Sequence, residues 1–354
     1  DIESHRSVIA DQFAHIAFRE SQAETPFHKQ VEQAWESGAS EDAWAALLES
    51  EEINEARLMA GILVSFATDT VTRKIDAAAR ARLQLFIPQL LQEIAKSDRP
   101  LRALTRTLSI VERILRRSAY LALLNENSGA LARLVYLCAR SNYIADQIAR
   151  FPVLLDELLD PRLYTESVTR ADLSEELRER LSDAGDESES CMHVISQFQR
   201  ATMFRIAVAD FNGKLPIMKV SDGLTWLAEC VLEEALRVAW RDLTERHGVP
   251  RYTVNGMTRE AGFGIVAYGK LGGLELSYGS DLDIVFLHDS CGEKQVTDGD
   301  KPLDNGLFFG RLVRRLVHFL TTQTGSGQLY EIDTRLRPDG RSGLLVTSTD
   351  AFER

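Results

Sequence analysis

The sequence predicts an α+β protein that is mostly helical, with a long helical N-terminal part followed by a small mixed sheet flanked by helices. Two observations carry this expectation. Up to Pro250, apolar residues recur at the three- and four-residue spacing of a helix face. After Pro250 the pattern changes to short apolar runs bounded by glycines, as in strands and turns.

Four segments of the first part show the helical spacing most clearly. Their apolar residues are Leu58, Ile62 and Phe66; Leu83, Ile87, Leu90 and Ile94; Leu104, Leu108, Val111 and Leu115; and Leu224, Leu227 and Val231. The arginines between 106 and 117 fall mostly elsewhere around their helix, and we interpret them as a solvated face rather than a docking surface. The acidic stretch 183–190 is expected to be an exposed loop.

Three strands and one further helix are expected after Pro250. The strands are predicted at residues 263–268, 282–287 and 329–336, and the helix at 307–320. The polar stretch from His288 to Asn305 contains two glycines and a proline and is expected to be a loop. We interpret His288 as an exposed loop residue and give it no role.

Composition narrows the classes of function. The chain carries a net charge of −12, whereas proteins that bind bulk nucleic acid usually present a basic surface. No apolar run reaches the roughly 20 residues needed to cross a bilayer, and no signal peptide is recognisable. Four widely spaced cysteines predict neither a zinc site nor disulfides. Because the chain begins at Asp1 and stops at Arg354, we expect it to be a fragment of a longer protein.

The strongest chemical pattern lies in residues 267–286, where two apolar runs flank a glycine-rich turn and the second run carries two aspartates. Asp281 and Asp283 are two residues apart, so on a strand their side chains point to the same face. Such carboxylates repel each other unless a cation lies between them, and hard oxygen ligands suit Mg²⁺. The alternative is a surface pair on an edge strand, but unpaired charge beside a buried apolar run is costly. We therefore predict a metal site.

The turn before the aspartates suits a nucleoside triphosphate. Gly269, Gly272 and Gly273 leave the backbone free to approach another group, and backbone N–H groups in such a turn can hold phosphate. Lys270 adds a positive charge, and Ser280 adds a hydroxyl beside the first aspartate. Glycines more often serve loop geometry alone, so the spacing to the aspartates is what favours phosphate binding. The turn is neither a Walker A loop nor a GxGxxG motif.

A third acidic residue follows on the last predicted strand. Alternation places Asp333 on the same face as Glu331, Arg335 and Arg337. In isolation this pattern is equally well a salt-bridge ladder. Beside the two-aspartate strand, Asp333 is expected to bind a second metal or to accept a proton from the attacking hydroxyl. The two arginines, with Arg341 as a further candidate, are then expected to bind triphosphate or the leaving pyrophosphate.

These residues match the pattern of the nucleotidyltransferase superfamily, although Lys270 stands where that pattern usually has serine or glycine. The longer strings Gly-Lys-Leu-Gly-Gly-Leu-Glu-Leu, Ser-Asp-Leu-Asp and Asp-Thr-Arg-Leu-Arg-Pro resemble the glutamine synthetase adenylyltransferase family. Strings at 150–158 and 215–222 extend the resemblance over about the last 250 residues. Tyr-Gly-Ser-Asp-Leu-Asp and Val-Phe-Leu-His-Asp look like the C-terminal, adenylylating half of that family.

The resemblance implies a polymerase-β-like nucleotidyltransferase core at 251–354, the helical part of the adenylyltransferase domain at 96–250, and a helical linker or regulatory segment at 1–95. It implies transfer of AMP from ATP to a tyrosine of glutamine synthetase, with release of pyrophosphate, to regulate nitrogen assimilation. Asp281, Asp283 and Asp333 would hold Mg²⁺ in a two-metal site. For the full-length multifunctional protein it implies PII signalling protein and glutamine as effectors. We expect a cytoplasmic location and no nucleic-acid or membrane partner.

Three alternatives stay open at this point. The first is the sibling half of the same family, which removes AMP from glutamine synthetase by phosphorolysis. The second is a related transferase that acts on another protein or on RNA, which the acidic net charge disfavours. The third is a binding module that has kept the fold without the chemistry, which the three intact aspartates disfavour.

Overall fold

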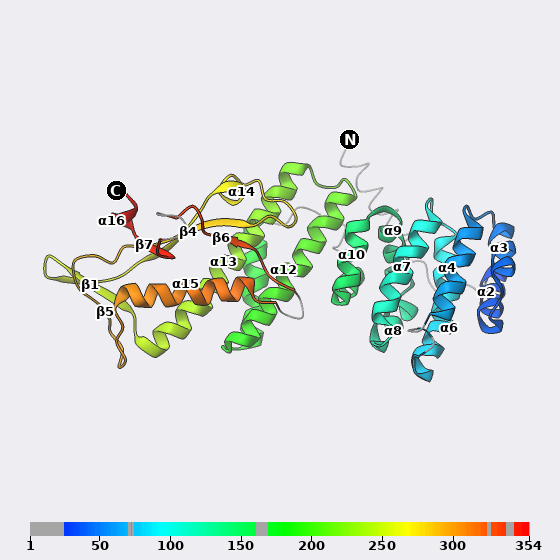
Figure 1. The fold of residues 1–354 in the computed structure, drawn as a ribbon, viewed down its shortest axis with the longest axis horizontal. Helices are drawn as coiled ribbons and strands as arrows, with labels where there is room; N and C mark the ends of the chain where they lie inside the picture. Colours follow the sequence, from blue (N-terminus) through cyan, green and yellow to red (C-terminus); the bar gives the residue numbers. More distant parts are fainter. Residues whose placement is uncertain are drawn as a thin grey trace. The chain divides into compact units, whose positions relative to one another are not determined.

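The structure, a computed structural model, describes residues 25–69, 72, 74–160, 169–323, 327–337 and 343–353. The chain divides into two compact units, Asp1–Tyr164 and Thr165–Arg354. The described elements of the first unit are helices, and the second unit combines helices with two small sheets (Figure 1). The predicted α+β, mostly helical class is therefore confirmed. The division into segments at residues 95 and 250 stays a prediction.

The first unit is built from short helices packed on one another. These are α2 (Pro26–Ser37), α3 (Glu41–Ser50), α4 (Ala56–Thr68), α6 (Ala77–Ile94), α7 (Pro100–Ile114), α8 (Ser118–Glu126), α9 (Ser128–Arg140), α10 (Asn142–Arg150) and the 3₁₀ helix η1 (Pro152–Leu159). The predicted apolar faces of α6 and α7 are buried. In α4 the core side is instead formed by Met59, Leu63 and Phe66, while Leu58 is exposed. Within the part of the chain that the structure describes, no helix is long and apolar enough to span a membrane.

The second unit carries every residue of the predicted site. Its helices are α11 (Arg170–Ala184), α12 (Ser188–Phe211), α13 (Ile217–His247), α14 (Gly269–Gly272), α15 (Asn305–Thr321) and α16 (Thr349–Phe352). Its strands are β1 (Pro250–Val254), β2 (Met257–Glu260), β3 (Phe263–Ala267), β4 (Leu282–His288), β5 (Glu293–Thr297), β6 (Ile332–Asp333) and β7 (Val346–Ser348).

Helices α12 and α13 pack side by side (Figure 1). In α13, Leu224, Leu227 and Val231 lie on the buried face, as predicted from their spacing. The loop predicted at 183–190 is shorter than expected, because α11 runs to Ala184 and α12 begins at Ser188, which leaves only the exposed residues 185–187 between them. Acidic residues favour the first turn of a helix through its dipole, so an acidic composition there marks a helix start as readily as a loop.

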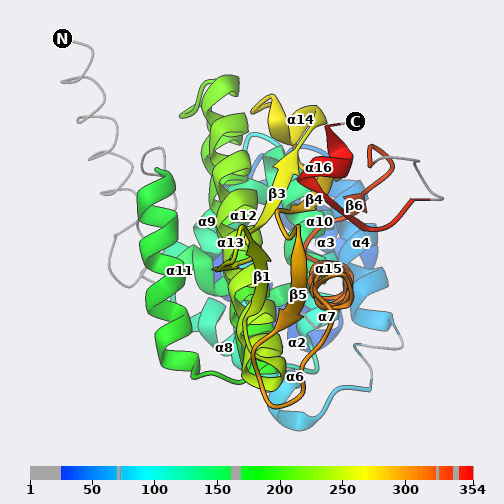
Figure 2. The same cartoon turned by 90° about the vertical axis from the view of Figure 1, so that its left-hand side faces the viewer.

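The sheet that holds the site is centred on β4. This strand pairs antiparallel with β3 and parallel with both β6 and β7. Figure 2 shows β3, β4 and β6 side by side. Ile284, Val285 and Phe286 are buried, as expected for a strand covered on both faces. Predicted strands at 263–268 and 282–287 thus correspond to β3 and β4, and α15 corresponds to the helix predicted at 307–320.

A second sheet, in the order β2-β1-β5, was not predicted. Strands β1 and β2 form a hairpin closed by Asn255 and Gly256, whose φ angles are +50° and +76°, as in a type I′ turn. Strand β5 lies inside the stretch 288–305, which was wrongly predicted to be all loop. Its residues are mainly polar and exposed, so they lack the apolar alternation by which a half-buried strand is recognised.

The third predicted strand is much shorter than 329–336. Strand β6 contains only Ile332 and Asp333, after which the chain turns. The cause is local, since the Asp333 carboxylate accepts a hydrogen bond of 2.8 Å from the Arg335 backbone N–H. An aspartate that binds the backbone two residues ahead forms a turn in place of continuing a strand. The predicted alternation of Arg335 and Arg337 with Asp333 on one strand face is therefore wrong.

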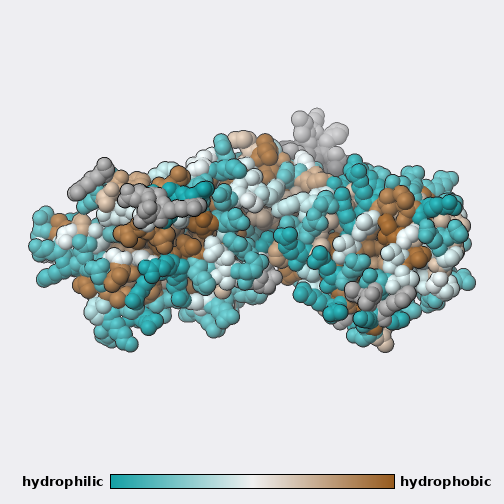
Figure 3. All heavy atoms as spheres, in the orientation of Figure 1, coloured by the Kyte–Doolittle hydropathy of each residue, from teal (hydrophilic) through white to brown (hydrophobic). Residues whose placement is uncertain are grey.

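Aromatic rings join the sheet to α15. Phe263 on β3 stacks on Phe286 at 6.2 Å and on Phe309 of α15 at 5.8 Å between ring centroids. Hydrophilic residues cover most of the face in Figure 3, while hydrophobic residues gather around β7 and α15. Leu336 and Leu344 are among the exposed large apolar residues of this unit. Stacked aromatic rings of Phe263, His288 and Phe309 thus form part of the contact between this sheet and α15.

Candidate active site

Three aspartates lie on, or directly before, two neighbouring strands. Asp283 on β4 lies directly opposite Asp333 on β6 in the parallel register. Asp281 immediately precedes β4, and the following Leu282 donates its backbone N–H to the carbonyl of Glu331 at 2.9 Å. Asp281 is exposed, and the other two aspartates are half-buried. Residues 50 apart in sequence are therefore brought to one end of the sheet by strand pairing.

The glycine turn lies against Asp283. The backbone N–H of Tyr268 donates to the carbonyl oxygen of Asp283 at 2.8 Å, which extends the pairing of β3 with β4 up to the turn. Gly269 follows with φ +54°, and a Cβ atom there would lie 2.1 Å from Oδ2 of Asp283. A Cβ atom at Gly272 would lie 2.6 Å from the carbonyl oxygen of Ala267. Both positions therefore require glycine because another group comes too close for a side chain.

The other predicted residues of the turn have different surroundings. Lys270 is exposed on the four-residue helix α14. Ser280 is half-buried, and its hydroxyl accepts a hydrogen bond of 3.1 Å from the backbone N–H of Ser277 and lies 2.9 Å from the Ser277 hydroxyl. At Gly273 an added Cβ would lie 3.3 Å from the carbonyl oxygen of Gly269. Ser280 thus closes the loop that leads into Asp281.

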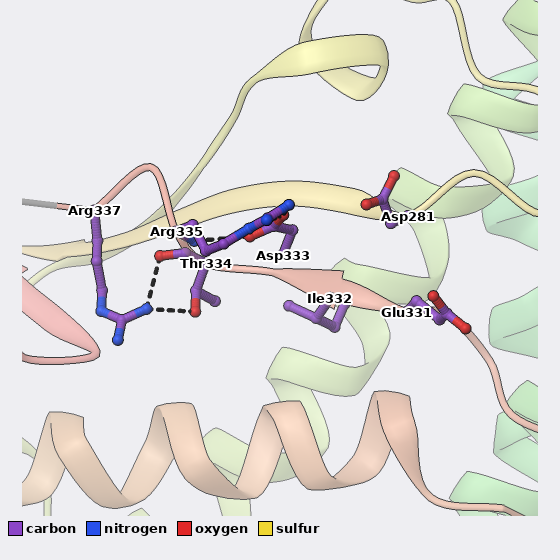
Figure 4. Close-up of a pocket in the computed structure, with 7 residues that line it drawn as sticks. All are labelled: Asp281, Glu331, Ile332, Asp333, Thr334, Arg335 and Arg337. Carbon is purple, nitrogen blue, oxygen red and sulfur yellow. Dashed lines mark hydrogen bonds and ion pairs between the residues drawn. The ribbon is translucent and has the colours of Figure 1, made fainter. Parts of the chain in front are cut away.

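Arg335 folds back on Asp333. Its Nε donates to Oδ2 of Asp333 at 2.7 Å, and a second guanidinium nitrogen contacts the same oxygen. Figure 4 shows the Arg335 side chain lying along the Asp333 carboxylate. The Asp333 carboxylate raises the pKa of Arg335, with smaller contributions from Asp281 and Asp283. Arg335 therefore lies within the negative field of all three aspartates.

Arg337 is used within the turn itself. Its Nη1 donates to the carbonyl oxygen of Thr334 at 2.7 Å and to the Thr334 hydroxyl at 2.6 Å (Figure 4). Its Nε donates to the carbonyl oxygen of Gly343 at 3.3 Å. In this arrangement Arg337 holds the turn after β6 together and does not lie beside the aspartates. Arg341 lies outside the described residues.

A pocket of about 550 Å³ opens at this end of the sheet. Its lining consists of Asp281, Glu331, Ile332, Asp333, Thr334, Arg335 and Arg337. Sequence reasoning gave no role to Thr334 or Glu331. Thr334 holds Arg337, and a polar β-branched residue directly after the third aspartate is the only sequence feature that points to it.

The donors present suit Mg²⁺, although no metal cage is preformed. Among the residues that the structure describes, no three or more His, Cys, Asp or Glu side chains are arranged to hold a metal ion together. Mg²⁺ usually needs only one or two protein carboxylates, because substrate phosphates and water supply the remaining oxygens. Asp283 and Asp333 are adjacent across the strand pair and carry hard oxygens of this kind. A metal role for Asp281, Asp283 and Asp333 stays a prediction.

His288 was wrongly interpreted as an exposed loop residue. It ends β4, is half-buried and stacks on Phe309 with 4.7 Å between ring centroids. Burial lowers its pKa, and the nearby Asp289 and Asp304 only partly oppose this. Cys138, Cys191 and Cys230 are buried free cysteines, and Cys291 is a partly buried one.

Asp283 on a central strand with Asp281 just before it, Asp333 on the parallel neighbour and a glycine turn packed against Asp283 match the arrangement expected of a nucleotidyltransferase. Comparison with known proteins agrees with that class. The sequence model described as glutamate-ammonia ligase adenylyltransferase matches residues 131–354. The chain belongs to this family.

The relatives of the chain share one description, bifunctional glutamine synthetase adenylyltransferase/adenylyl-removing enzyme. The protein of Thioalkalivibrio sulfidiphilus is 45% identical over 361 residues, which cover 100% of this chain and 37% of the relative. The protein of Pseudomonas putida is 47% identical over 323 residues, or 90% of this chain and 33% of the relative. The chain thus spans about a third of the length of these relatives. The similarity reaches further than the last 250 residues predicted.

Proposed function

We propose that the second unit transfers AMP from ATP to a tyrosine of glutamine synthetase and releases pyrophosphate. The observation that carries this is the pairing of Asp283 with Asp333 beside the glycine turn, in a chain of the glutamate-ammonia ligase adenylyltransferase family. The relatives are described as acting on glutamine synthetase. For the longer protein we propose PII protein and glutamine as effectors, and for the reaction a cytoplasmic location.

In this proposal the aspartates bind the metal, and the glycine turn with Lys270 binds the phosphates. Asp281 and Asp283 would hold Mg²⁺, with Asp333 as a third carboxylate, and bound Mg²⁺ would neutralise charge on the phosphates of ATP. Gly269 and Gly272 leave room for phosphate close to the backbone, and exposed Lys270 adds a positive charge. Asp333 is suited to accept the proton of the attacking tyrosine hydroxyl.

Arg335 has two roles in this proposal. In the structure its guanidinium forms an ion pair with Asp333. With Mg²⁺ and ATP bound, the same guanidinium would turn to the phosphates, since arginine binds phosphate oxygens through two parallel N–H groups. We propose only a supporting role for Arg337, because its hydrogen bonds hold the turn.

The direction of reaction is the finer part of the proposal. The relatives are described as both adding and removing the adenylyl group, so family membership fits either half. The strings Tyr-Gly-Ser-Asp-Leu-Asp and Val-Phe-Leu-His-Asp, which look like the adenylylating half, favour AMP addition. The competing outcome is phosphorolysis, in which phosphate attacks AMP-modified glutamine synthetase and ADP leaves.

The decisive experiment incubates the chain with ATP, Mg²⁺ and glutamine synthetase and measures the AMP mass added to tyrosine. Asp281→Asn and Asp283→Asn should each lower the rate by at least about a hundredfold, because a metal-bound charge contributes several kcal/mol to such a reaction. Asp300→Asn, an exposed aspartate in the loop before α15, is the matched control and should keep the wild-type rate. Full activity in both site variants would contradict the proposal.

A second assay separates the two directions. The chain is mixed with AMP-modified glutamine synthetase and phosphate, and release of ADP is followed. Rapid ADP release together with absent AMP addition would assign the phosphorolytic half. Labelling of RNA in place of glutamine synthetase would identify a transferase of another substrate class.

A further inference from the structure

Tyr278, in the loop between α14 and β4, is the starting point of this inference. Its hydroxyl donates a hydrogen bond of 3.1 Å to Oδ2 of Asp210 on α12. The two residues are 68 apart in sequence and come from different elements of the same unit. Both are half-buried, so the hydrogen bond is partly withdrawn from water. The contact therefore joins the loop that leads to Asp281 to a long helix outside the sheet.

The ring of Tyr278 also packs against the hydrophobic core of the unit, and its neighbour Leu276 is buried. Around these two anchors the loop is exposed at Leu274, Glu275 and Gly279. Without the hydroxyl the loop would keep its apolar packing and lose the hydrogen bond to Asp210. The hydroxyl can thus be tested apart from the fold.

The same helix holds the other half of the site. Gln199 of α12 donates through Nε2 to the carbonyl oxygen of Leu329 at 3.2 Å, and Arg200 donates to the carbonyl oxygen of Gln328 at 3.3 Å. These carbonyls belong to the segment that enters β6 and Asp333. Gln199 and Asp210 are eleven residues apart, which is about three helical turns, so both lie on one side of α12 about 16 Å apart.

We propose that Asp210 and Tyr278 are a positioning pair. Their hydrogen bond connects the loop 273–281 to α12, the same helix that contacts the segment before Asp333, and so fixes the loop relative to Asp333. This inference rests on the proposed nucleotidyl transfer and adds two residues to its machinery, neither of which touches the substrate. The helix supplies a common frame: Gln199 and Arg200 set the approach to β6, and Asp210 sets the approach to Ser280 and Asp281. A rigid frame of this kind keeps reacting groups in place before ligand binds.

The test uses Tyr278→Phe, which keeps the ring and removes only the donor. Tyr252→Phe in strand β1, outside the site-bearing sheet, is the matched control. Binding of Mg²⁺ with a non-hydrolysable ATP analogue is measured by calorimetry, and amide hydrogen exchange is measured over residues 273–281. We expect Tyr278→Phe to weaken analogue binding about tenfold, as for one lost hydrogen bond to a charged group, and to speed exchange in that loop. Tyr252→Phe should change neither.

Asp210 variants complete the design. Asp210→Leu should reproduce the Tyr278→Phe effect, and the double variant should be no worse than either single one. Asp210→Asn keeps an acceptor oxygen and should restore most of the binding. Wild-type binding and wild-type loop exchange in Tyr278→Phe would overturn the inference while leaving AMP transfer intact. If wild-type protein binds no analogue and transfers no AMP, the proposed function fails. Unchanged loop exchange in Tyr278→Phe would then also show that the Tyr278–Asp210 hydrogen bond does not restrain the loop.

Discussion

Gly269→Ala is the sharpest single perturbation of the site, because it adds one methyl group beside Asp283. The new Cβ would lie 2.1 Å from Oδ2 and 3.0 Å from Cγ of Asp283, and Cβ contacts below 3.0 Å are essentially never seen. The carboxylate or the turn must therefore move by about 1 Å. The positive φ of +54° adds about 1–2 kcal/mol of backbone strain for any residue with a Cβ.

The loss of stability from backbone strain and the loss of rate from a displaced Asp283 carboxylate can be measured separately. A misplacement of about 1 Å in a catalytic group can cost about a hundredfold in rate, or about 2.7 kcal/mol of barrier. Gly256→Ala in the β1–β2 turn is the control, since its φ is +76° and no atom lies within 4 Å of the added Cβ. Urea unfolding should show a loss of about 1–2 kcal/mol from backbone strain in both variants, with a further loss in Gly269→Ala because its Cβ also meets Asp283.

Only Gly269→Ala should also lose about a hundredfold in AMP transfer to glutamine synthetase. The assay is the initial rate of tyrosine labelling at saturating ATP. Equal transfer rates in the two alanine variants would refute the argument, because they would show that the position of the Asp283 carboxylate does not matter for the reaction.

Three further predictions follow from burial and charge. Phe286→Ala removes a fully buried ring and should lower the free energy of unfolding by about 3–5 kcal/mol in urea denaturation; a loss below 1 kcal/mol would contradict the packing described. Burial lowers the pKa of His288, so the unfolded chain binds a proton at higher pH, and stability should be present above about pH 6.5 and fall as pH drops through the folded pKa. His288→Phe should remove that component between pH 7.5 and 5.5, and an unchanged pH dependence would argue against it. Arg335→Ala removes the ion pair with Asp333 and should strengthen nucleotide-free Mg²⁺ binding in calorimetry while slowing AMP transfer. Arg337→Ala should leave Mg²⁺ binding as it is, and the opposite ranking would be inconsistent with the ion pair.

Elements with strong burial patterns were predictable from sequence. The stripes of α6, α7 and α13 repeat at helical spacing because one side of each faces a core. Strands β3 and β4 were predicted from short apolar runs next to a glycine turn. Strand β2 is exposed at every residue, and β5 is exposed at most of its residues. Neither strand therefore shows the apolar alternation by which a half-buried strand is recognised. The dipeptide Asn255–Gly256 was the available sign of the hairpin.

The chemistry of the site was only partly accessible in the same way. The spacing of Gly269, Asp281 and Asp283 predicts a metal and phosphate site, which stays a prediction, and the structure does bring Gly269 against Asp283. The length of β6 was not predictable, since it depends on the hydrogen bond that the Asp333 carboxylate accepts from the backbone N–H of Arg335. The ion pair of Arg335 with Asp333 and the hydrogen bond between Tyr278 and Asp210 of α12 leave no periodic pattern in the sequence, because both depend on how the chain folds in three dimensions.

Strand β4 has a consequence for how variants of this protein should be sorted. From Asp281, which directly precedes the strand, to Ile284, carboxylates of the proposed site alternate with buried core positions, so neighbouring codons report on different properties. In a saturation scan, substitutions at Leu282, Ile284 and Phe286 should reduce the amount of folded protein in the cell. Substitutions at Asp281 and Asp283 should leave abundance nearly unchanged and remove transfer. A scan that scores growth alone would merge the two groups, whereas paired abundance and activity scores would separate Asp281 and Asp283 from the buried residues beside them.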